Sequence, residues 1–337
     1  CDGRGCVTIT RIARARWSAH VSRRGRRKSL NVLSRASRAV SAAVSGRSFS
    51  AQVLDDFVRP VVDPAIYTLR GRVTNDLLSG SGLEIGAGLH PQELPPNATC
   101  VYFDKLDAAA LRDLFGASVP YSVHPIGEIG LLFPAGADFL IAHNVLEHSA
   151  DPISTLMLWM SHVTPGGIVI ISIPDKHYCP GDADRVVPPL EHILLDFLSA
   201  NSDDSFESRE HILSFLAGWH EYIRPGMSKS EYLAYCLSEL GRSGHDLHWH
   251  AMDTDLAAMI IHASALLSKR SIRIVRTCTP SSEHFKTLGE TIFAIQMDAI
   301  DPDSDVACAV AGRIDHMART LGAWCDALSG IHKSLSP

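Results

Sequence analysis

The segment LEIGAG at residues 83–88 places an apolar run directly before two glycines that are separated by one residue. In an open α/β sheet a buried strand ends at the edge where ligands bind, and glycines at that edge let the backbone turn tightly and approach a ligand closely. Gly-x-Gly also occurs in ordinary turns, so the segment alone does not specify a cofactor. Pro91 stands where the third glycine of a dinucleotide fingerprint would fall. The loop is therefore predicted to hold a cofactor without a pyrophosphate.

An acidic residue follows the next apolar run. Asp104 ends the predicted strand at 100–103, sixteen residues after Gly88. A carboxylate in this position can accept hydrogen bonds from both ribose hydroxyls of an adenosine, as the acid of the second strand does in dinucleotide sites. The glycine loop and Asp104 together favour an adenosine cofactor without phosphates.

Short apolar runs alternate with helical stretches on both sides of this loop. The predicted strands are 82–85, 100–103, 121–124, 138–142, 167–173, 271–277 and 290–297, and the predicted helices outside the insertion are 152–163, 253–268 and 306–328. Strands that alternate with crossovers of this length imply a mostly parallel sheet with helices on both faces. The polar region 175–250, with helical patterns at 190–198, 211–220 and 231–240, interrupts the alternation. We expect this region to be an inserted helical cap.

A longer block of motifs resembles a known family. It consists of DFLIAHNVLEH at 138–148, Asp151-Pro152, TPGG at 164–167 and ISIPD at 171–175. This order is similar to the signature block of class I S-adenosylmethionine-dependent methyltransferases of the type-11 group. The similarity covers about 225 residues and is strongest over 82–104 and 137–192. The AGA segment at 135–137 and the third strand depart from the pattern. The resemblance implies an α/β, Rossmann-like, seven-stranded and mostly parallel sheet, the class I methyltransferase fold, with a helical cap after the fifth strand and S-adenosylmethionine as the cofactor.

The resemblance also implies which residues contact that cofactor. They are Glu84, Gly86, Ala87, Gly88, Asp104, Lys105, His143, Asn144 and Val145. Asn144 is expected to hydrogen-bond the methionine amino or carboxylate group. Glu84 is expected to receive the methionine ammonium or to order the glycine loop. Glu147 and His148 are expected to lock the loop after the fourth strand to the following helix.

Candidate groups for the chemistry are Asn144, His177 and Tyr178. Methyl transfer needs mainly proximity and alignment, and it needs a base only when the acceptor loses a proton. His177 titrates near neutrality and is a candidate base, while Tyr178 offers an aromatic face to the sulfonium. No metal is expected. The histidines in HNVLEH at 143–148 and HDLHWH at 245–250 do not match zinc-hydrolase spacing, so we interpret them as structural.

Three functions are compatible with these residues. The first is methyl transfer to an oxygen or nitrogen of a small molecule bound under the cap, with a role in secondary metabolism. The second uses the same cofactor but breaks its Cγ–S bond, by aminocarboxypropyl transfer or by cyclisation to azetidine-2-carboxylate with release of methylthioadenosine. The third is a non-catalytic binding module of the same fold.

Composition limits the class of partner. The 337 residues are 46% hydrophobic and 20% charged, which is ordinary for a soluble globular protein. Residues 1–50 carry twelve Lys or Arg against the single acid Asp2, which leaves 19 basic and 36 acidic residues in the remainder. An acidic body repels a phosphate backbone, so we expect a small-molecule substrate and no nucleic acid. No apolar run approaches the roughly 20 residues of a spanning helix, so no membrane is expected.

Eight scattered cysteines without a Cys-x-x-Cys pair fit a reducing compartment, and we expect a cytoplasmic protein. The Arg/Ser-rich start shares its composition with organellar transit peptides. Because Met157 is the first methionine, we instead expect a fragment end or sequence upstream of the true start. The expected parts are 1–50 outside the fold, 51–78 N-terminal helices, 79–174 cofactor-binding core, 175–250 cap, 251–300 return of the sheet and 301–337 C-terminal helix.

Overall fold

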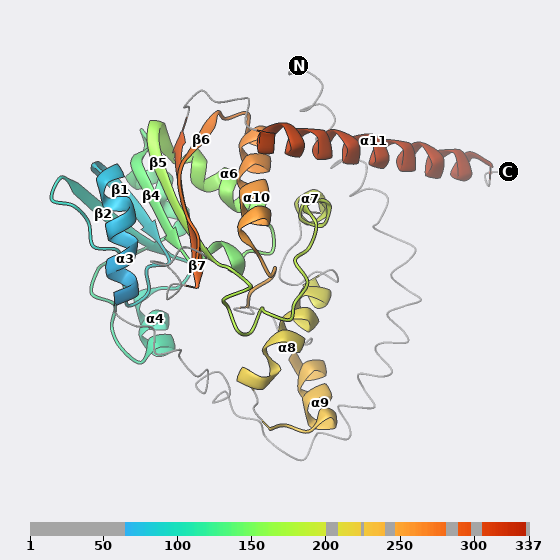
Figure 1. The fold of residues 1–337 in the computed structure, drawn as a ribbon, viewed down its shortest axis with the longest axis horizontal. Coiled ribbons are helices and arrows are strands. Elements are labelled where there is room, and N and C mark those ends of the chain that lie inside the picture. Colours follow the sequence, from blue (N-terminus) through green and yellow to red (C-terminus); the bar gives the residue numbers. More distant parts are fainter. Residues whose placement is uncertain are drawn as a thin grey trace.

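The computed structural model describes residues 65–199, 208–223, 226–239, 247–280, 289–297 and 305–334. The expectations for residues 1–50, and for the first part of the N-terminal helices, lie outside these residues. A single twisted sheet forms the centre of the described part, with helices on both of its faces (Figure 1).

The sheet has seven strands. They are β1 (Gly80–Ile85), β2 (Ala98–Asp104), β3 (Val123–Pro125), β4 (Ala137–His143), β5 (Val163–Pro174), β6 (Ile272–Cys278) and β7 (Glu290–Met297). Their order is β3-β2-β1-β4-β5-β7-β6. All neighbours are parallel except the two pairs that β7 makes with β5 and β6. The predicted seven-stranded, mostly parallel α/β sheet is confirmed.

Most strands differ from the predicted ranges by one or two residues at an end, and the differences in β3 and β5 have structural causes. β3 begins at Val123, so Tyr121 lies before the strand, where its ring stacks on Tyr102 with centroids 4.1 Å apart. β5 begins at Val163 instead of residue 167, because the pairing with β4 jumps from Ala137↔Val163 to Phe139↔Ile168. The TPGG segment therefore forms an irregularity inside the strand. Gly166, with φ 80°, provides the left-handed conformation there.

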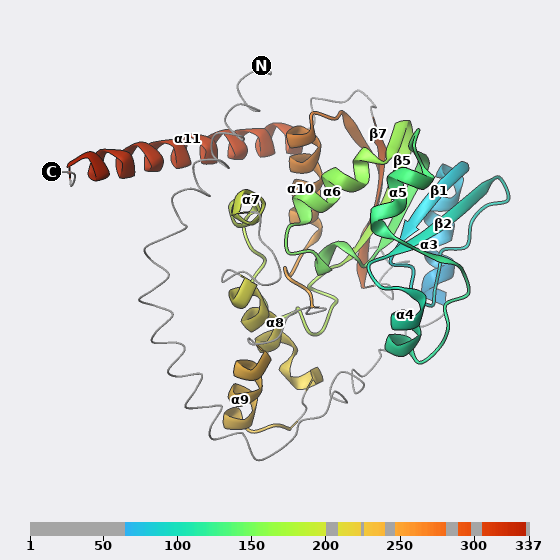
Figure 2. The same cartoon turned by 180° about the vertical axis from the view of Figure 1, so that it is seen from behind.

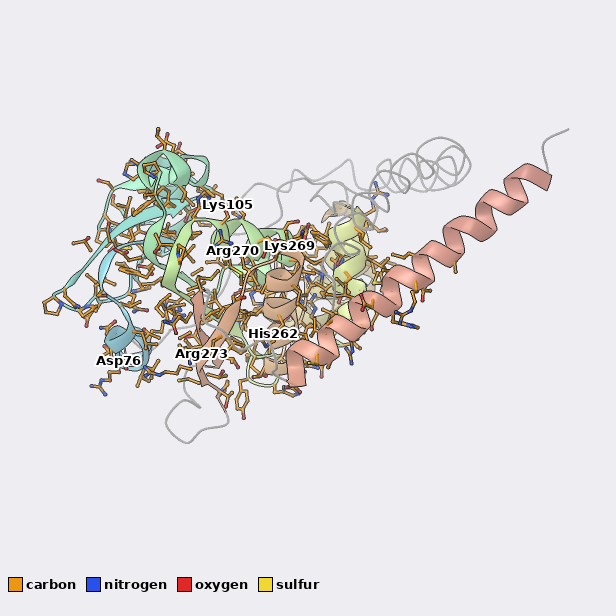
Figure 3. The ribbon with its side chains drawn as sticks, turned by 90° about the horizontal axis from the view of Figure 1, so that it is seen from above. Asp76, Lys105, His262, Lys269, Arg270 and Arg273 are labelled. Atoms are coloured by element: carbon orange, nitrogen blue, oxygen red, sulfur yellow. The ribbon has the colours of Figure 1, made fainter. Side chains whose placement is uncertain are left out.

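Helices fill the connections between strands. They are α3 (Ala65–Thr74), α4 (Ala108–Phe115), α5 (Ile129–Leu132), α6 (Pro152–Ser161), α7 (Leu190–Ser199), α8 (Ser208–Ile223), α9 (Lys229–Glu239), α10 (Thr254–Ser268) and α11 (Asp305–Ser334), with 3₁₀ turns η2 (Asn75–Leu77), η3 (Ile126–Glu128) and η4 (Leu146–His148). Asp107, Asp151 and Asp253 cap α4, α6 and α10, because each carboxylate accepts a backbone N–H three residues later. Lys269, labelled in Figure 3, ends α10 in a left-handed conformation with φ 57°.

Alternate side chains of the central strands divide the core into two layers. Leu140 and Ala142 belong to the larger layer, which packs against α6 and α10. Phe139 and Ile141 point to the opposite face, where α3 covers the sheet. α3 and the pair α6 and α10 lie on opposite sides of the sheet in both cartoon views (Figures 1 and 2).

The helical region, between β5 and α10, includes α7, α8 and α9 among its described residues and has a small apolar cluster of its own. Phe215 and Leu216 of α8 pack there with Cys236 of α9 and with Trp249. Ala150, from the segment that follows β4, belongs to the same cluster. The helices α8 and α9 lie side by side beyond the end of the sheet (Figure 2). The packing of Ala150 places this region beside the carboxyl end of β4. That it covers a substrate stays a prediction.

α11 begins against the core and extends away from it (Figures 1 and 2). Val310 and Met317 pack into the larger core layer, in contact with α10 and α7. Every helix in the described part of the chain is too short or too polar to cross a lipid bilayer.

Candidate active site

The carboxyl ends of three neighbouring parallel strands meet at one edge of the sheet. β1 lies between β2 and β4, with Ile85 paired to Phe103 on one side and to Ala142 on the other. The backbone N–H of Gly86 donates to the Phe103 carbonyl at 2.9 Å, which ties the glycine loop to β2. The glycine loop, Asp104 and Asn144 therefore share the edge where open α/β sheets bind their ligands.

Backbone conformation at this edge requires the glycines. Gly86 and Gly88 have φ of 67° and 56°. A Cβ atom on Gly86 would lie 2.7 Å from Cγ2 of Val145, so a side chain there would collide as well as strain the turn. Val145 thus packs directly against the loop from the neighbouring strand end. A close approach of backbone to ligand is available only because residue 86 has no side chain.

Asn144 adopts a left-handed conformation at the end of β4. Its φ is 54°, and Asn144 and Lys269 are the non-glycine residues with positive φ in the described part of the chain. Such a conformation costs of the order of 1–3 kcal/mol and clusters at functional sites, although asparagine tolerates it better than most residues. The N–H of Asn144 donates to the Ser172 carbonyl at 3.0 Å, and its Oδ1 lies 3.4 Å from Ser172 Oγ. The side chain is exposed, so its amide N–H₂ can reach a ligand.

Asp104 is oriented by its own loop. Its Oδ1 accepts the backbone N–H of Leu106 at 2.9 Å. Lys105, exposed and labelled in Figure 3, follows directly. Tyr121 donates its hydroxyl to the Gly88 carbonyl at 2.7 Å and closes the far side of the loop. The structure places Gly86, Ala87, Gly88, Asp104 and Lys105 at one edge of the sheet, where strands β1 and β2 end. Their contacts with a ligand stay a prediction.

A buried polar network lies directly behind this edge. The backbone N–H of Gln92 donates to both carboxylate oxygens of Glu84 at 3.2 Å. The Oε1 of Gln92 lies 2.7 Å from Nε2 of His143, and Nδ1 of His143 lies 3.0 Å from Oγ of Ser172. Ser172 in turn donates to Glu290 of β7 at 2.9 Å. The imidazole of His143 is 7% exposed and engaged at both nitrogens, so its direct contact with a ligand stays a prediction.

One ion pair closes the network from the other end. Arg70 of α3 donates from Nε and Nη2 to the two carboxylate oxygens of Glu290, both at 2.7 Å. Arg70 is 7% and Glu290 1% exposed, so the pair is screened from water. The network connects α3, β1, β4, β5 and β7 beneath the glycine loop.

Glu84 is buried, and the structure favours its role in ordering the loop. Only 1% of the residue is exposed, and its partner Gln92 lies four residues after Gly88. Burial raises the pKa of Glu84 to about 7, although the Gln92 hydrogen bond and the charge of Arg70 both oppose the shift.

This pKa predicts a specific loss of stability as the pH rises. The unfolded carboxyl loses its proton near 4.5 and the folded one near 7, so the protonated fold is favoured at low pH and the advantage is lost as pH rises through 7. Between these pH values the wild type is expected to lose on the order of 3 kcal/mol of its free energy of unfolding. Glu84→Gln, which keeps an acceptor for Gln92, is expected not to show this loss. Urea unfolding of both proteins from pH 4.5 to 8 measures the difference. The exposed Glu93→Gln is the control, and parallel curves for wild type and Glu84→Gln would contradict the prediction.

The segment after β5 carries the two other candidates. Nδ1 and the backbone N–H of His177 lie 2.9 and 3.0 Å from Oδ1 of Asp175, which is itself 6% exposed. The His177 side chain is 62% exposed and Tyr178 is 41% exposed. Because β5 runs parallel to β4, both residues reach the same edge of the sheet as Asn144. Their roles in catalysis stay predictions.

The helical region contains a hydrogen-bonded pair, Asp182 and His248, that the sequence analysis did not identify. Nδ1 of His248 lies 2.6 Å from Oδ2 of Asp182. The other oxygen of Asp182 accepts from Arg185 at 2.7 Å and from the Trp219 indole at 3.0 Å. Burial alone would raise the pKa of Asp182, but the hydrogen bonds from His248 and Arg185 outweigh it, and the pKa is lowered. An ionised Asp182 accepts only, so Nδ1 of His248 carries a proton, and in the neutral ring Nε2 carries the lone pair.

Two more titratable groups face His248. Its ring packs against His148 with centroids 5.0 Å apart, and Nε2 of His148 lies 3.9 Å from Oε1 of Glu147. Glu147 is 1% exposed, burial raises its pKa, and neither carboxylate oxygen has a hydrogen-bond partner among the described residues. Glu147 holds the helical region through its backbone carbonyl, which accepts the N–H of Trp249 at 2.8 Å. The side chains of Glu147 and His148 thus belong to a polar cluster with His248.

This polar cluster, formed by Glu147, His148, Asp182 and His248, is adjacent to the glycine loop. The N–H of His148 donates to the Val145 carbonyl at 3.2 Å, and Val145 packs on Gly86. The sequence feature that could have indicated this cluster is the alternation His248-Trp249-His250. Its two imidazoles contact different carboxylates, those of Asp182 and Asp196. Spacing along the chain could not show that Asp182, 66 residues earlier, is the partner of His248.

Comparison with known proteins adds structural likenesses. No family model matches the chain, and no curated protein matches it. Among solved structures, it is similar to the citrinin polyketide synthase CMeT domain (12% identity, TM-score 0.32, 69% of this chain and 50% of that one), so it spans half the length of that relative. It is also similar to the plantazolicin methyltransferase BpumL (13%, TM-score 0.34, 88% and 98%) and to an S-adenosylmethionine-dependent methyltransferase from Clostridium acetobutylicum (11%, TM-score 0.39, 74% and 98%).

The order β3-β2-β1-β4-β5-β7-β6 with an antiparallel β7 forms the Rossmann-like, seven-stranded and mostly parallel sheet that the sequence motifs predicted.

Proposed function

We propose that this protein binds S-adenosylmethionine at the carboxyl edge of β1, β2 and β4 and transfers its methyl group to an oxygen or nitrogen of a small molecule. One observation carries the proposal. The left-handed glycines 86 and 88, the oriented carboxylate of Asp104 and the left-handed Asn144 meet at a single edge of a sheet with this strand order. A crevice at that edge is where folds of this kind bind nucleoside cofactors.

Each group at the edge has a distinct role in holding the cofactor. Gly86 and Gly88 give the adenosyl group access to the backbone. Asp104 accepts hydrogen bonds from the ribose hydroxyls. The amide N–H₂ of Asn144 donates to the methionine carboxylate. Glu84 keeps the loop in place from behind, through its hydrogen bonds with Gln92.

The polar cluster beside Val145 supports a role for His248 as the base. Methyl transfer is an in-line displacement at carbon, and the acceptor hydroxyl or amine must lose a proton as the new bond forms. Asp182 holds Nδ1 of His248, so Nε2 is the atom that accepts this proton. The Glu147 carboxylate, once ionised, stabilises the imidazolium that results. His177, the base expected from the sequence, is the alternative at the same edge.

The region from 175 to 250 is proposed to cover the acceptor. The run IPDK at 173–176 and LEH at 190–192 is similar to a bacterial subset of these enzymes found beside secondary-metabolite genes. We therefore place the acceptor among small molecules of that kind. Five cysteines lie in the described part of the chain, and all five are free thiols. They support a cytoplasmic setting.

Product analysis tests the reaction. Purified protein is incubated with S-adenosylmethionine, first alone and then with a panel of phenols, alcohols and amines, and the products are identified by mass. Methyl transfer yields S-adenosylhomocysteine together with an acceptor that has gained a methyl group. Methylthioadenosine would instead show that the Cγ–S bond is broken. Titration calorimetry that detects no binding of either S-adenosyl compound would leave only the non-catalytic module.

Asp104→Ala is expected to weaken the binding of S-adenosylhomocysteine by more than about 1 kcal/mol, because two charge-assisted hydrogen bonds to the ribose are lost. Titration calorimetry measures this difference. Asp113→Ala, which removes a carboxylate with 77% side-chain exposure on α4, is the matched control. An Asp104→Ala protein with unchanged affinity would show that the ribose binds elsewhere.

A further inference from the structure

Four side chains from three separate segments converge on one point in the helical region. His192 and Asp196 lie on α7, His211 lies on α8 and His250 lies just before α10. The Nε2 atoms of His250, His192 and His211 lie 2.9, 3.5 and 3.6 Å from Oδ2 of Asp196. A ligand atom from each of the four residues lies within 4.8 Å of the others.

The cluster is largely enclosed. His211, His250 and Asp196 are between 2% and 5% exposed, while the His192 side chain is 31% exposed and leaves one side open. The imidazole rings of His192, His211 and His250 pack edge to face with centroids 4.6 to 5.7 Å apart. Three imidazoles and one carboxylate directed at a common point form a donor set typical of divalent transition metals.

The hydrogen bond of His211 identifies which of its nitrogens faces the centre. Its Nδ1 lies 3.1 Å from the Trp249 carbonyl, which can only accept, so Nδ1 carries the proton. In the neutral ring Nε2 then carries a lone pair, and this lone pair faces another acceptor, Oδ2 of Asp196. The contact is favourable only when a proton on Nε2, in the imidazolium, or a metal cation lies between the two atoms. A backbone carbonyl that holds Nδ1 is also the outer contact that metal-bound histidines usually make.

We infer that His192, Asp196, His211 and His250 bind one divalent transition-metal ion, with zinc as the best fit. Four protein ligands in a mostly buried site correspond to a structural rather than a catalytic zinc. The ion would cross-link α7, α8 and the segment before α10. Since Trp249, between the two histidines of that segment, also binds the Glu147 backbone, the ion would fix the helical region against the carboxyl end of β4. This replaces the expectation of purely structural histidines, and it does not depend on the proposed cofactor.

Metal analysis of the untagged full chain tests the site. The protein is loaded with Zn²⁺, dialysed and analysed by mass spectrometry of its metal content. One zinc per chain is expected for the wild type, and at least a tenfold weaker zinc affinity for His192→Ala, whose partly exposed side chain is least needed for folding. His262→Ala, which removes a buried histidine of α10 labelled in Figure 3, is the matched control and should keep the ion. A wild-type chain without zinc, or a His192→Ala protein with unchanged affinity, would overturn the inference.

Cobalt substitution gives a second readout on the wild-type protein alone. Co²⁺ in a site of three imidazoles and a carboxylate is expected to show visible d–d absorption without a thiolate charge-transfer band. A thiolate band would place the metal on Cys179, which lies with Asp182 and His248 in another group of potential ligands, and would overturn the assignment. A chelator is expected to lower the melting temperature of the loaded protein. Identical melting with and without zinc would contradict the cross-linking role.

Discussion

Glu290→Ala is expected to lower the free energy of unfolding by about 3–5 kcal/mol, because it removes the buried carboxylate that accepts two N–H groups of the Arg70 guanidinium. Glu290 accepts both N–H groups of the Arg70 fork at 2.7 Å, and it accepts the Ser172 hydroxyl as well. The two residues are 220 positions apart, so the pair joins α3 to the penultimate element of the chain. Urea unfolding followed by circular dichroism measures the loss.

An exposed bidentate pair of an arginine and a carboxylate is the control. Arg276 binds both carboxylate oxygens of Asp76, labelled in Figure 3, but the Asp76 side chain is 61% exposed. Asp76→Ala is therefore expected to cost no more than about 1 kcal/mol. Replacement of both buried partners, in Arg70→Met with Glu290→Leu, is expected to recover much of the lost stability. Equal decreases in the free energy of unfolding for Glu290→Ala and Asp76→Ala would show that burial does not make the Arg70–Glu290 pair more important for stability than the exposed pair.

His248→Ala is expected to reduce kcat by about 10²- to 10⁴-fold with the acceptor identified by product analysis, because the transition state loses its base. The affinity for S-adenosylhomocysteine should not change, since His248 lies beyond Val145 from the glycine loop. Added imidazole should restore part of the activity by occupying the space of the lost ring. The measurement is the initial rate of S-adenosylhomocysteine formation at saturating cofactor.

His177→Ala separates the two candidate bases. Its imidazole is 62% exposed, and its partner Asp175 is held by Thr254 as well. If His248 is the base, His177→Ala should change kcat by less than tenfold. A large loss in His177→Ala together with an active His248→Ala would assign the proton transfer to His177. Because the two residues lie on different segments, one experiment decides between them.

A chain of contacts connects the glycine loop to the polar cluster and the polar cluster to the inferred metal site. Val145 packs on Gly86, His148 bonds to Val145, and His248 packs on His148. His250, two residues further, turns to Asp196. A metal ion at Asp196 would therefore fix the backbone that carries His248, without contact between the ion and the substrate. Zinc removal is consequently expected to affect catalysis by changing the position of His248, because the ion itself does not contact the substrate.

Local patterns in the sequence predicted the fold and the edge of the sheet that carries the candidate site. Strands and helices were predictable because apolar runs, caps such as Asp151 and the glycines at 86 and 88 are local signals, readable within a few residues. The order of motifs from 138 to 175 then specified the family of folds. The exact start of β5 was missed, since the irregularity at TPGG depends on its pairing with β4.

The pairing of polar side chains could not be predicted from the sequence and is visible only in the folded chain. Arg70 and Glu290, Asp182 and His248, and Asp196 and His250 are separated by 220, 66 and 54 residues. Their pairing follows from how the helical region folds back on the sheet, and no spacing along the chain encodes it. The same holds for His192, Asp196, His211 and His250, which form one cluster because three segments meet there. Secondary structure follows from the pattern of neighbouring residues, whereas the polar side chains of the candidate sites come together only when distant segments of the chain meet.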